Sequence, residues 1–359
     1  MSQGRVRTVP DPAEILALAH RSGIEVVGFA AAHPFAEARG EIERRKAAGL
    51  HGGMAFTYRN PARSTDPSRA VAGARSLVVG ARSYRGAEPG RSPGTRPVGT
   101  VARYSRTDHY RPLRDGLEAV AGLLRSGGWT AKVLVDDNAL VDRAAAHRAG
   151  LGWFGKNTVL LLPGRGSWFV LGSVVTDAPL SFEPAAEISD GCGTCTRCMT
   201  ACPTGALDEA GVLDARRCLA WLLEAPGDFP EEHRAALGGR IYGCDVCQEV
   251  CPVNRRVDRD DPAPPAQDGE ETWVDLVELL QSDDSVLLER FGRWYIPGRD
   301  VRHIRRNALI ALGNVAQADD PSVQAVLADA IHGMDPMLSS HAAWAAARLG
   351  RTGLAGALP

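Results

Sequence analysis

All eight cysteines of this 359-residue chain lie between Cys192 and Cys251. Four of them, starting at Cys192, follow the spacing C-x2-C-x2-C-x3-C and are followed by Pro203, the pattern with which bacterial ferredoxins hold cubane iron–sulfur clusters. A second group, starting at Cys244, follows the spacing C-x2-C-x3-C-P and needs one more thiolate, which Cys218 can supply. In a chain without features of secretion, metal or redox chemistry is the more natural use for such thiols than disulfides.

The two groups together predict two [4Fe–4S] clusters with no cysteine left over. In the ferredoxin pattern three thiolates on one tight loop share a cluster, and the fourth ligates the other cluster. The first cluster is therefore expected to be ligated by Cys192, Cys195, Cys198 and Cys251, and the second by Cys202, Cys218, Cys244 and Cys247. Structural zinc is the alternative, because paired C-x2-C units also bind zinc, but zinc does not require the longer run. Clusters of this kind carry electrons, so another part of the chain must use them.

The composition is that of an ordinary soluble globular protein, with 44% hydrophobic and 23% charged residues. The first residues contain no apolar segment of a signal peptide, and no run of about eighteen apolar residues follows, so we expect a cytoplasmic protein without a membrane span. A formal net charge of −2 provides no general attraction to nucleic acid, so any such contact must come from a local basic patch.

Alternating strand and helix patterns predict an α/β domain over residues 1–182. Helices are expected at 11–23, 34–49, 111–128 and 138–150, strands at 24–30 and 130–135, and a buried strand at 76–84. Residues 157–162 and 167–177 are expected to form a hairpin through the turn PGRG. This domain is the natural place to look for the destination of the electrons.

A ferredoxin-like module at 183–260 and a proline-rich linker, DRDDPAPPAQDGEET, lead to a helical domain at 272–359. Segments 304–316 and 338–350 align at an offset of 34 residues, and both carry small residues at helix-packing positions. This period is typical of paired-helix repeats of the HEAT type.

A local cluster of basic residues lies on the first of these helices and includes Arg302, Arg305 and Arg306. Such clusters are the usual electrostatic footprint of nucleic-acid binding. The alternative is a solvated basic face without a partner. The three arginines are therefore candidate phosphate contacts.

Six segments that are spread over most of the chain form a specific set: HGGMAF (51–56), VDDNALVDRAAAHRAGLGWFGKNT (135–158), GSWFVLG (166–172), CGTCTRCMTACPTGAL (192–207), LDARRC (213–218) and GGRIYGCDVCQEVCP (238–252). This set resembles the epoxyqueuosine reductases, a family of cobalamin-dependent enzymes that complete queuosine at the wobble position of tRNA. Many ferredoxins share the cysteine pattern, but its combination with GLGWFGKNT upstream and paired helices downstream is specific.

The resemblance implies a base-off cobalamin in the α/β domain and the reduction of an epoxide to an alkene. The sequence has no D-x-H-x-x-G motif, so no histidine of that motif is available as a lower cobalt ligand. Electrons would pass through the two clusters to cobalt. The implied partners are a tRNA carrying epoxyqueuosine and an external low-potential electron donor, and a monomer is expected.

In the segment LVDDNALVDR, Asp136 falls on the position of the family's proton-donating aspartate. A carboxyl at the end of a strand, facing a pocket covered by an apolar corrin, would have a raised pKa and stay protonated. The sequence departs from the family pattern V-D-[ST]-[AG]-P, with Asp137, Asn138 and Ala139 after the aspartate. The alternative for Asp136 is an N-cap of the helix expected to begin near Asn138.

The resemblance also implies contacts to the cofactor. These residues are Arg59, Tyr104, Lys156, Asn157, Thr158 and Asp245, together with Asp136. Lys156 is one of only three lysines in the chain, which favours a role for its compact, flexible ammonium. The alternatives are a surface arginine at 59 and a simple tight turn at 155–158.

Two other functions are compatible with the sequence. A cobalamin and iron–sulfur reductase of another substrate, similar to reductive dehalogenases, would fit the altered residues after Asp136. A two-cluster electron carrier would have little use for the first domain or for the helical repeats. The basic helical domain favours the tRNA-modifying reductase, because a dehalogenase of small molecules has no evident need for it.

Overall fold

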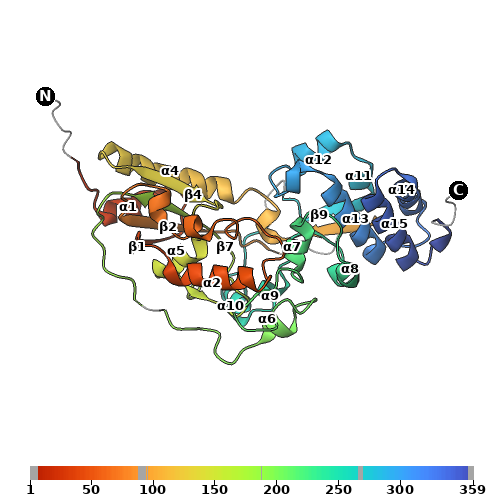
Figure 1. The fold of residues 1–359 in the computed structure, drawn as a ribbon, viewed down its shortest axis with the longest axis horizontal. Coiled ribbons are helices and arrows are strands. Elements are labelled where there is room, and N and C mark those ends of the chain that lie inside the picture. Colours follow the sequence, from red (N-terminus) through yellow and green to blue (C-terminus); the bar gives the residue numbers. More distant parts are fainter. Residues whose placement is uncertain (1–6, 88–93, 95, 187, 266–269, 355–359) are drawn as a thin grey trace.

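The computed structural model describes residues 7–87, 94, 96–186, 188–265 and 270–354. Figure 1 shows an elongated molecule with a sheet-containing part at one end, a group of helices at the other, and the cysteine-rich segment below and between them. Among the described helices, none is both long enough and apolar enough to cross a membrane.

The first part is built on a four-stranded sheet in the order β1-β2-β7-β4, in which every neighbouring pair is antiparallel. Its strands are β1 (Val26–Ala31), β2 (Ser76–Ser83), β4 (Ala131–Val135) and β7 (Phe169–Thr176). The predicted mixture of strands and helices is therefore present. The antiparallel direction differs from the parallel sheet that a strand–helix alternation usually indicates, because the order of elements does not fix strand direction.

Helices cover both faces of this sheet. On one face α1 (Pro12–Arg21) and α4 (Tyr110–Ser126) bury Ile15 and Leu117 against Val133 of the sheet. On the other face α5 (Asp142–Arg148) buries Ala145 against Leu134. The helix predicted at 34–49 is α2 (Ala36–Ala47), none of whose residues is fully buried.

The predicted hairpin of 157–162 and 167–177 is wrong. Strand β6 (Leu160–Leu161) pairs with β5 (Trp153–Phe154), and β7 uses both of its edges to pair with β2 and β4. Between the two predicted strands there is a single bridge, from Leu162 to Gly166. Strand β7 is central and largely buried, so its partners are other strands of the sheet rather than its neighbour in the sequence.

A second sheet joins the three regions that the sequence separates. Its order is β8-β3-β9, with strands β3 (Val98–Val101), β8 (Arg240–Tyr242) and β9 (Trp273–Asp275). One hydrophobic core contains Leu219 and Ile241 of the predicted cluster module together with Leu276 and Leu309 of the helical domain. The second half of the cluster module therefore packs as part of the helical unit.

The remaining helices lie mainly in the cysteine-rich and C-terminal regions. They are α3 (Pro61–Ser64), α6 (Arg197–Thr200), α7 (Leu219–Glu224), α8 (Glu231–Leu237), α9 (Val246–Glu249), α10 (Pro252–Asp260), α11 (Leu276–Gln281), α12 (Asp284–Phe291), α13 (Arg302–Val315), α14 (Pro321–His332) and α15 (Pro336–Arg348), with short 3-10 turns at 67–69, 103–105, 297–299 and 352–354. The two predicted repeat segments are α13 and α15, which pack against each other. A Cβ on Gly313 would lie 2.8 Å from Ala345 Cα, so the close approach of these helices requires glycine there.

Candidate active site

Asp136 directly follows β4 and has a backbone φ of +50°, in the left-handed region that few non-glycine residues adopt. The next residues form a turn in which Asp137 Oδ1 accepts a hydrogen bond from Ala139 N at 2.8 Å. Helix α5 begins only at Asp142, so Asp136 does not cap it and the N-cap alternative is wrong. Backbone strain of this kind is typical of functional positions.

The Asp136 side chain faces a cavity and is reached by solvent, but the protein that surrounds the cavity still shifts the pKa of its carboxyl. Burial raises the pKa of Asp136 above its ordinary value, the Arg114 guanidinium opposes the rise, and the Asp137 carboxylate adds to it. Arg114 Nη2 donates to Val135 O at 2.7 Å, so the backbone holds this guanidinium. Asp136 therefore favours its protonated form more than an ordinary aspartate does.

Two cavities meet at Asp136. The larger, of about 1050 Å³, is lined by α2, the segment 54–58, α5, the turn at 154–158 and part of β7. The smaller, of about 350 Å³, has mainly aromatic walls, which are formed by Phe56, Tyr104, Tyr110, Trp221, Tyr242, Trp294 and Tyr295. Met54, Phe56, Tyr110 and Asp136 line both cavities. The Asp136 carboxyl thus borders both spaces.

A second unusual carboxyl lines the larger cavity. Asp142, at the start of α5, has its Oδ1 atom buried without a hydrogen-bond partner among the described residues. Burial raises the pKa of Asp142 well above its usual value, and the Asp136 and Asp137 carboxylates add to the rise. A buried polar atom without a partner is costly, so it marks a place where a bound group can supply the missing hydrogen bond.

The HGGMAF segment is held in place by the cysteine-rich region. Trp221 Nε1 donates to Gly52 O at 2.8 Å. Gly52 has a φ of +56°, and a Cβ on it would lie 3.0 Å from Arg216 N, so both the conformation and the space require glycine. This anchoring fixes Met54 and Phe56, which line both cavities.

The GKNT turn connects the larger cavity to the cysteine loops. Lys156 Nζ donates to Gly193 O at 2.6 Å, and Asn157 Nδ2 donates to Cys247 O at 3.3 Å. Thr158, with a φ of +67°, lines the larger cavity, and its contact with a cofactor stays a prediction. Lys156 and Asn157 do not belong to the described lining of that cavity; they fasten one loop of each cysteine group beside it.

The cysteines of the two predicted sets lie close enough to affect one another's pKa, within each set and, for Cys198 and Cys247, across them. Burial raises the pKa of Cys198, and the nearby Cys192 and Cys251 add to the rise. Burial likewise raises the pKa of Cys218 to about 11, with contributions from Cys244 and Cys202. The other two predicted ligands are Cys195, of the first set, and Cys247, whose pKa is raised by burial and then by Cys244 and Cys218. Cys218 thus lies near Cys244 and Cys202, and its place in the second ligand set stays a prediction.

Three further predicted cofactor contacts have different positions. Tyr104 lines the smaller cavity, and its hydroxyl donates to Glu224 Oε1 at 2.8 Å. Arg59 is exposed and is not among the described residues that line either cavity. Asp245 is buried, and its Oδ2 accepts a hydrogen bond from Arg103 N at 2.6 Å, so it joins two backbone segments away from both cavities. The structure gives no support to Arg59 or Asp245 as cofactor contacts.

Glu224 is a candidate site residue that the sequence analysis missed. It is the last residue of α7 and lines the smaller cavity. Burial raises its pKa to about 7, the hydrogen bond from Tyr104 lowers it and the Asp136 charge raises it. In the sequence, LLEAPGD has the pattern of an ordinary helix end, so no local signal could have identified this residue.

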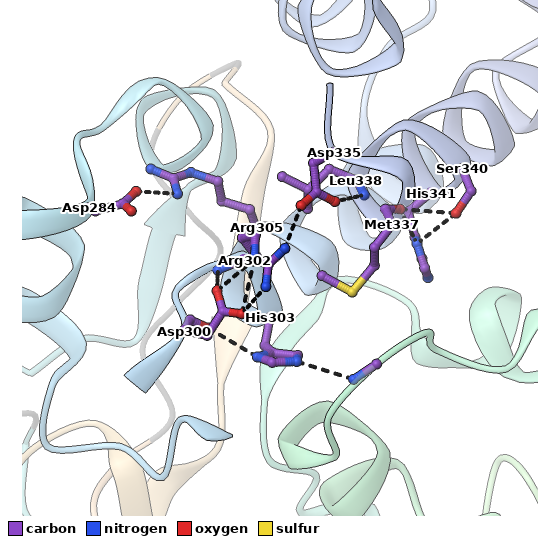
Figure 2. A network of polar contacts seen from close by, with 11 residues as sticks. Asp284, Asp300, Arg302, His303, Arg305, Asp335, Met337, Leu338, Ser340 and His341 are labelled. Carbon is purple, nitrogen blue, oxygen red and sulfur yellow. Dashed lines mark hydrogen bonds and ion pairs between the residues drawn. The ribbon is translucent and has the colours of Figure 1, made fainter. Parts of the chain in front are cut away.

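Figure 2 shows that two of the three candidate phosphate contacts on α13 already have acidic partners. Arg302 pairs with Asp300 at 2.6 Å and with Asp335 at 2.8 Å. Arg305 pairs with Asp284 at 2.5 Å. Arg302 is exposed, so solvent and other anions can still reach its guanidinium.

Arg306 has a different role from the one predicted. Its side chain is 0% exposed, and the guanidinium donates to the backbone carbonyls of Leu222, Leu223, Ala225 and Gly227. These carbonyls end helix α7, which has no further helical N–H groups to satisfy them. Arg306 cannot contact phosphate; it caps the helix that carries Trp221 and Glu224.

The cysteine-rich region is similar to a known family of iron–sulfur domains. A family model described as a 4Fe-4S double cluster binding domain matches residues 191–254. This stretch contains all eight cysteines. The prediction of two [4Fe–4S] clusters is therefore confirmed.

Curated relatives match almost the whole chain. Epoxyqueuosine reductase of Bacillus anthracis is 33% identical over 352 residues, which cover 96% of this chain and 90% of that protein. Epoxyqueuosine reductase of Bacillus subtilis strain 168 is 34% identical over 343 residues, which cover 94% and 87%.

Solved structures agree with these relatives. A crystal structure of epoxyqueuosine reductase with an epoxyqueuosine-modified stem loop of tRNA-Tyr matches with a TM-score of 0.85 and 32% identity, over 94% of this chain and 90% of the other. A structure of the Bacillus subtilis enzyme with a catalytic aspartate loop swung out of the active site matches with a TM-score of 0.84 over the same shares, at 32% identity. On this similarity over nearly its full length, the chain belongs to the epoxyqueuosine reductase family.

Proposed function

We propose that this protein reduces epoxyqueuosine to queuosine at the wobble position of tRNA, with Asp136 as the proton donor. The observation that carries this proposal is the position of Asp136, whose raised pKa and strained backbone occur where the two cavities meet. The relative from Bacillus subtilis has a catalytic loop that contains an aspartate, which supports the assignment.

The larger cavity is assigned to cobalamin, in the base-off form. Its volume of about 1050 Å³ is at the upper end of the range for ligand sites, as a large cofactor requires. The unpartnered Asp142 oxygen fits a cofactor rich in amide groups, since a protonated carboxyl can donate to an amide oxygen and accept from an amide nitrogen. Thr158 and Arg143 line the same cavity and offer further polar contacts. When bound there, cobalamin supplies a strongly reducing two-electron centre.

The reduction consumes two electrons and two protons, and it converts the epoxide to an alkene with release of water. The GKNT turn holds one loop of each cysteine group beside the cavity, and two clusters bound by these cysteines would supply electrons from an external low-potential donor. Asp136 protonates the departing epoxide oxygen, because a poor leaving group needs a proton as the C–O bond breaks. The aromatic walls of the smaller cavity exclude water and stack on the modified base.

The C-terminal helices α11–α15, a HEAT-like unit, are assigned to the surrounding tRNA. Arg302 and Arg305 are the candidate phosphate contacts that remain after Arg306 is excluded. Exchange of their aspartate partners for phosphate would make binding dependent on salt. The protein is proposed to act as a monomer in the cytoplasm, where tRNA is modified.

Anaerobic purification followed by iron, sulfide and cobalt analysis tests the cofactors, and turnover of an epoxyqueuosine stem loop tests the reaction. We expect near eight irons and one cobalt per chain after loading with cobalamin, and formation of queuosine with a chemical reductant. Eight irons without cobalt would instead indicate an electron carrier. Turnover of an aryl halide but not of the stem loop would indicate a dehalogenase.

A further inference from the structure

The smaller cavity contains a second carboxyl, that of Glu224, besides the proposed proton donor Asp136. A hydrogen bond fixes the orientation of the Glu224 carboxyl. Glu224 Oε1 accepts a hydrogen bond from Tyr104 Oη at 2.8 Å, and Tyr242 lines the same cavity. Tyr242 Oη itself accepts from Tyr295 N at 2.8 Å, so its own proton is available to Glu224. The Tyr104 phenol therefore holds the carboxyl at the cavity wall.

No cation among the described residues is paired with Glu224. Arg293 lines the same cavity, but its Nη2 donates to two backbone carbonyls, at 2.9 Å each. Asp108 and Asp136 also line the cavity, so its carboxyls outnumber its guanidinium. A partly buried carboxylate without a positive partner is unfavourable, and a bound cation would relieve this.

The walls of the cavity suit a cation with an apolar neighbour. Tyr104, Trp221, Tyr242 and Trp294 line the same cavity as Glu224. Aromatic faces attract ammonium groups, and cages of such residues commonly bind substituted amines. A carboxylate at the wall of such a cage adds a charged hydrogen bond.

We propose that Glu224 binds the secondary ammonium group of the substrate and thereby positions the epoxide at Asp136. The inference rests on the proposed function. In epoxyqueuosine this amine joins the epoxide-bearing cyclopentane ring to the methylene group of the 7-deazaguanine base, and it is protonated near neutral pH. Asp136 faces the same cavity, so a group that holds the amine also fixes the ring against the proton donor. Burial raises the pKa of Glu224 to about 7, and a bound ammonium would favour its ionised form.

The competing possibility is that Glu224 accepts hydrogen bonds from the guanine-like edge of the base. Carboxylates also recognise paired N–H donors of that kind. The two possibilities can be distinguished by comparing stem loops with different wobble bases, because unmodified guanosine has the same base edge but no amine. A stem loop with 7-aminomethyl-7-deazaguanosine has both groups, and one with 7-cyano-7-deazaguanosine has the edge without a positive charge.

The test compares binding of these stem loops to the cluster- and cobalamin-loaded protein and to Glu224→Gln. We expect the variant to lose roughly 10- to 100-fold in affinity for the epoxyqueuosine and aminomethyl stem loops and to bind the guanosine stem loop as before, since charged hydrogen bonds are worth this much. Glu118→Gln is the matched control, because Glu118 is exposed on α4 and pairs with Arg125 at 2.8 Å. Iron content and thermal unfolding verify that both variants fold.

An equal loss for the guanosine stem loop would show that Glu224 reads the base edge, and unchanged affinity for every RNA would remove it from recognition. The unsubstituted protein gives a second measurement that needs no variant, since it should prefer the aminomethyl to the cyano stem loop by a similar factor. Equal affinity for these two would overturn the inference. Turnover of the epoxyqueuosine stem loop by the same preparation is recorded separately, so failure of the proposed function appears as lack of queuosine and not as a change in RNA preference.

Discussion

Asp136 and Arg306 are both charged residues that the sequence favours as functional, and the structure treats them in opposite ways. Asp136 opens into a cavity, has a strained backbone and has a carboxyl whose pKa is raised by burial. Arg306 is fully buried and donates to four carbonyls at the end of α7. Asp136 can therefore contact a substrate in the cavity, whereas the guanidinium of Arg306 is fully occupied by hydrogen bonds within the protein.

This difference teaches that the presence of a charged side chain does not by itself distinguish a residue that contacts substrate from one that stabilises the surrounding fold. Arg306 nevertheless acts on the same site, because the helix that it caps carries Trp221 and Glu224 at the wall of the smaller cavity. A substitution of Asp136 should therefore change chemistry and leave stability, whereas a substitution of Arg306 should change stability first.

The largest effect is expected for Asp136→Asn. General acid catalysis is typically worth about 10²–10⁴-fold, so turnover of the stem loop should fall by that factor. Asparagine accepts the φ of +50° about as well as aspartate, so the clusters, the cobalamin and the thermal midpoint should be retained. Near-normal turnover would remove Asp136 from the role of proton donor, and loss of cobalamin would assign it to holding the cofactor.

Arg306→Leu should reduce the free energy of unfolding by about 3–5 kcal/mol, because each buried acceptor that loses its donor costs about 1–3 kcal/mol. Urea unfolding of the anaerobic protein measures this. Arg302→Leu makes the same change on the exposed side of α13 and should leave the unfolding midpoint nearly unaltered. Equal effects of the two substitutions would contradict the assignment of Arg306 as the cap of α7.

The pH dependence of turnover should identify the acid. Because the pKa of Asp136 is raised, its protonated form persists to higher pH than that of an ordinary aspartate, and turnover should be high below this pKa and fall by about tenfold per unit above it. Asp142 and Glu224 titrate nearby, so the control is Asp136→Asn, whose residual turnover should lose this slope. A slope that persists in the variant would assign the titration to another group.

The smallest effect is expected for Arg302→Ala combined with Arg305→Ala. Each lost phosphate contact should reduce the magnitude of the log–log salt slope of tRNA binding by less than about one unit, with cobalamin binding unchanged. Filter binding of full-length tRNA over a range of salt concentrations measures it. An identical slope would mean that these residues serve only their ion pairs with Asp300, Asp335 and Asp284.

Local patterns predicted the local parts of this molecule well. The helix expected at 11–23 is α1, and its N-cap is Asp11, whose Oδ1 accepts a hydrogen bond from Ala13 N at 2.7 Å. Apolar runs predicted the positions of β1, β2 and β4, although the edge strand β1 is only half-buried. They could not predict the partner of β7, since strand pairing depends on residues distant in the sequence.

The sequence by itself determined the cluster chemistry and the place of Asp136. Thiolate spacing on short loops is a local property, so a region that binds two clusters could be predicted from the cysteines, and the assignment of each cysteine to a cluster stays a prediction. The position of Asp136 after an apolar strand is equally local.

Only the tertiary structure decided which other polar residues face a cavity. Lys156 reaches Gly193, Arg306 reaches the end of α7, and Glu224 meets Tyr104 across large separations in the chain. Whether a charged side chain is satisfied by the fold or left for a ligand depends on such distant partners. Burial and hydrogen-bond partners arise when the chain packs, and no local pattern contains them.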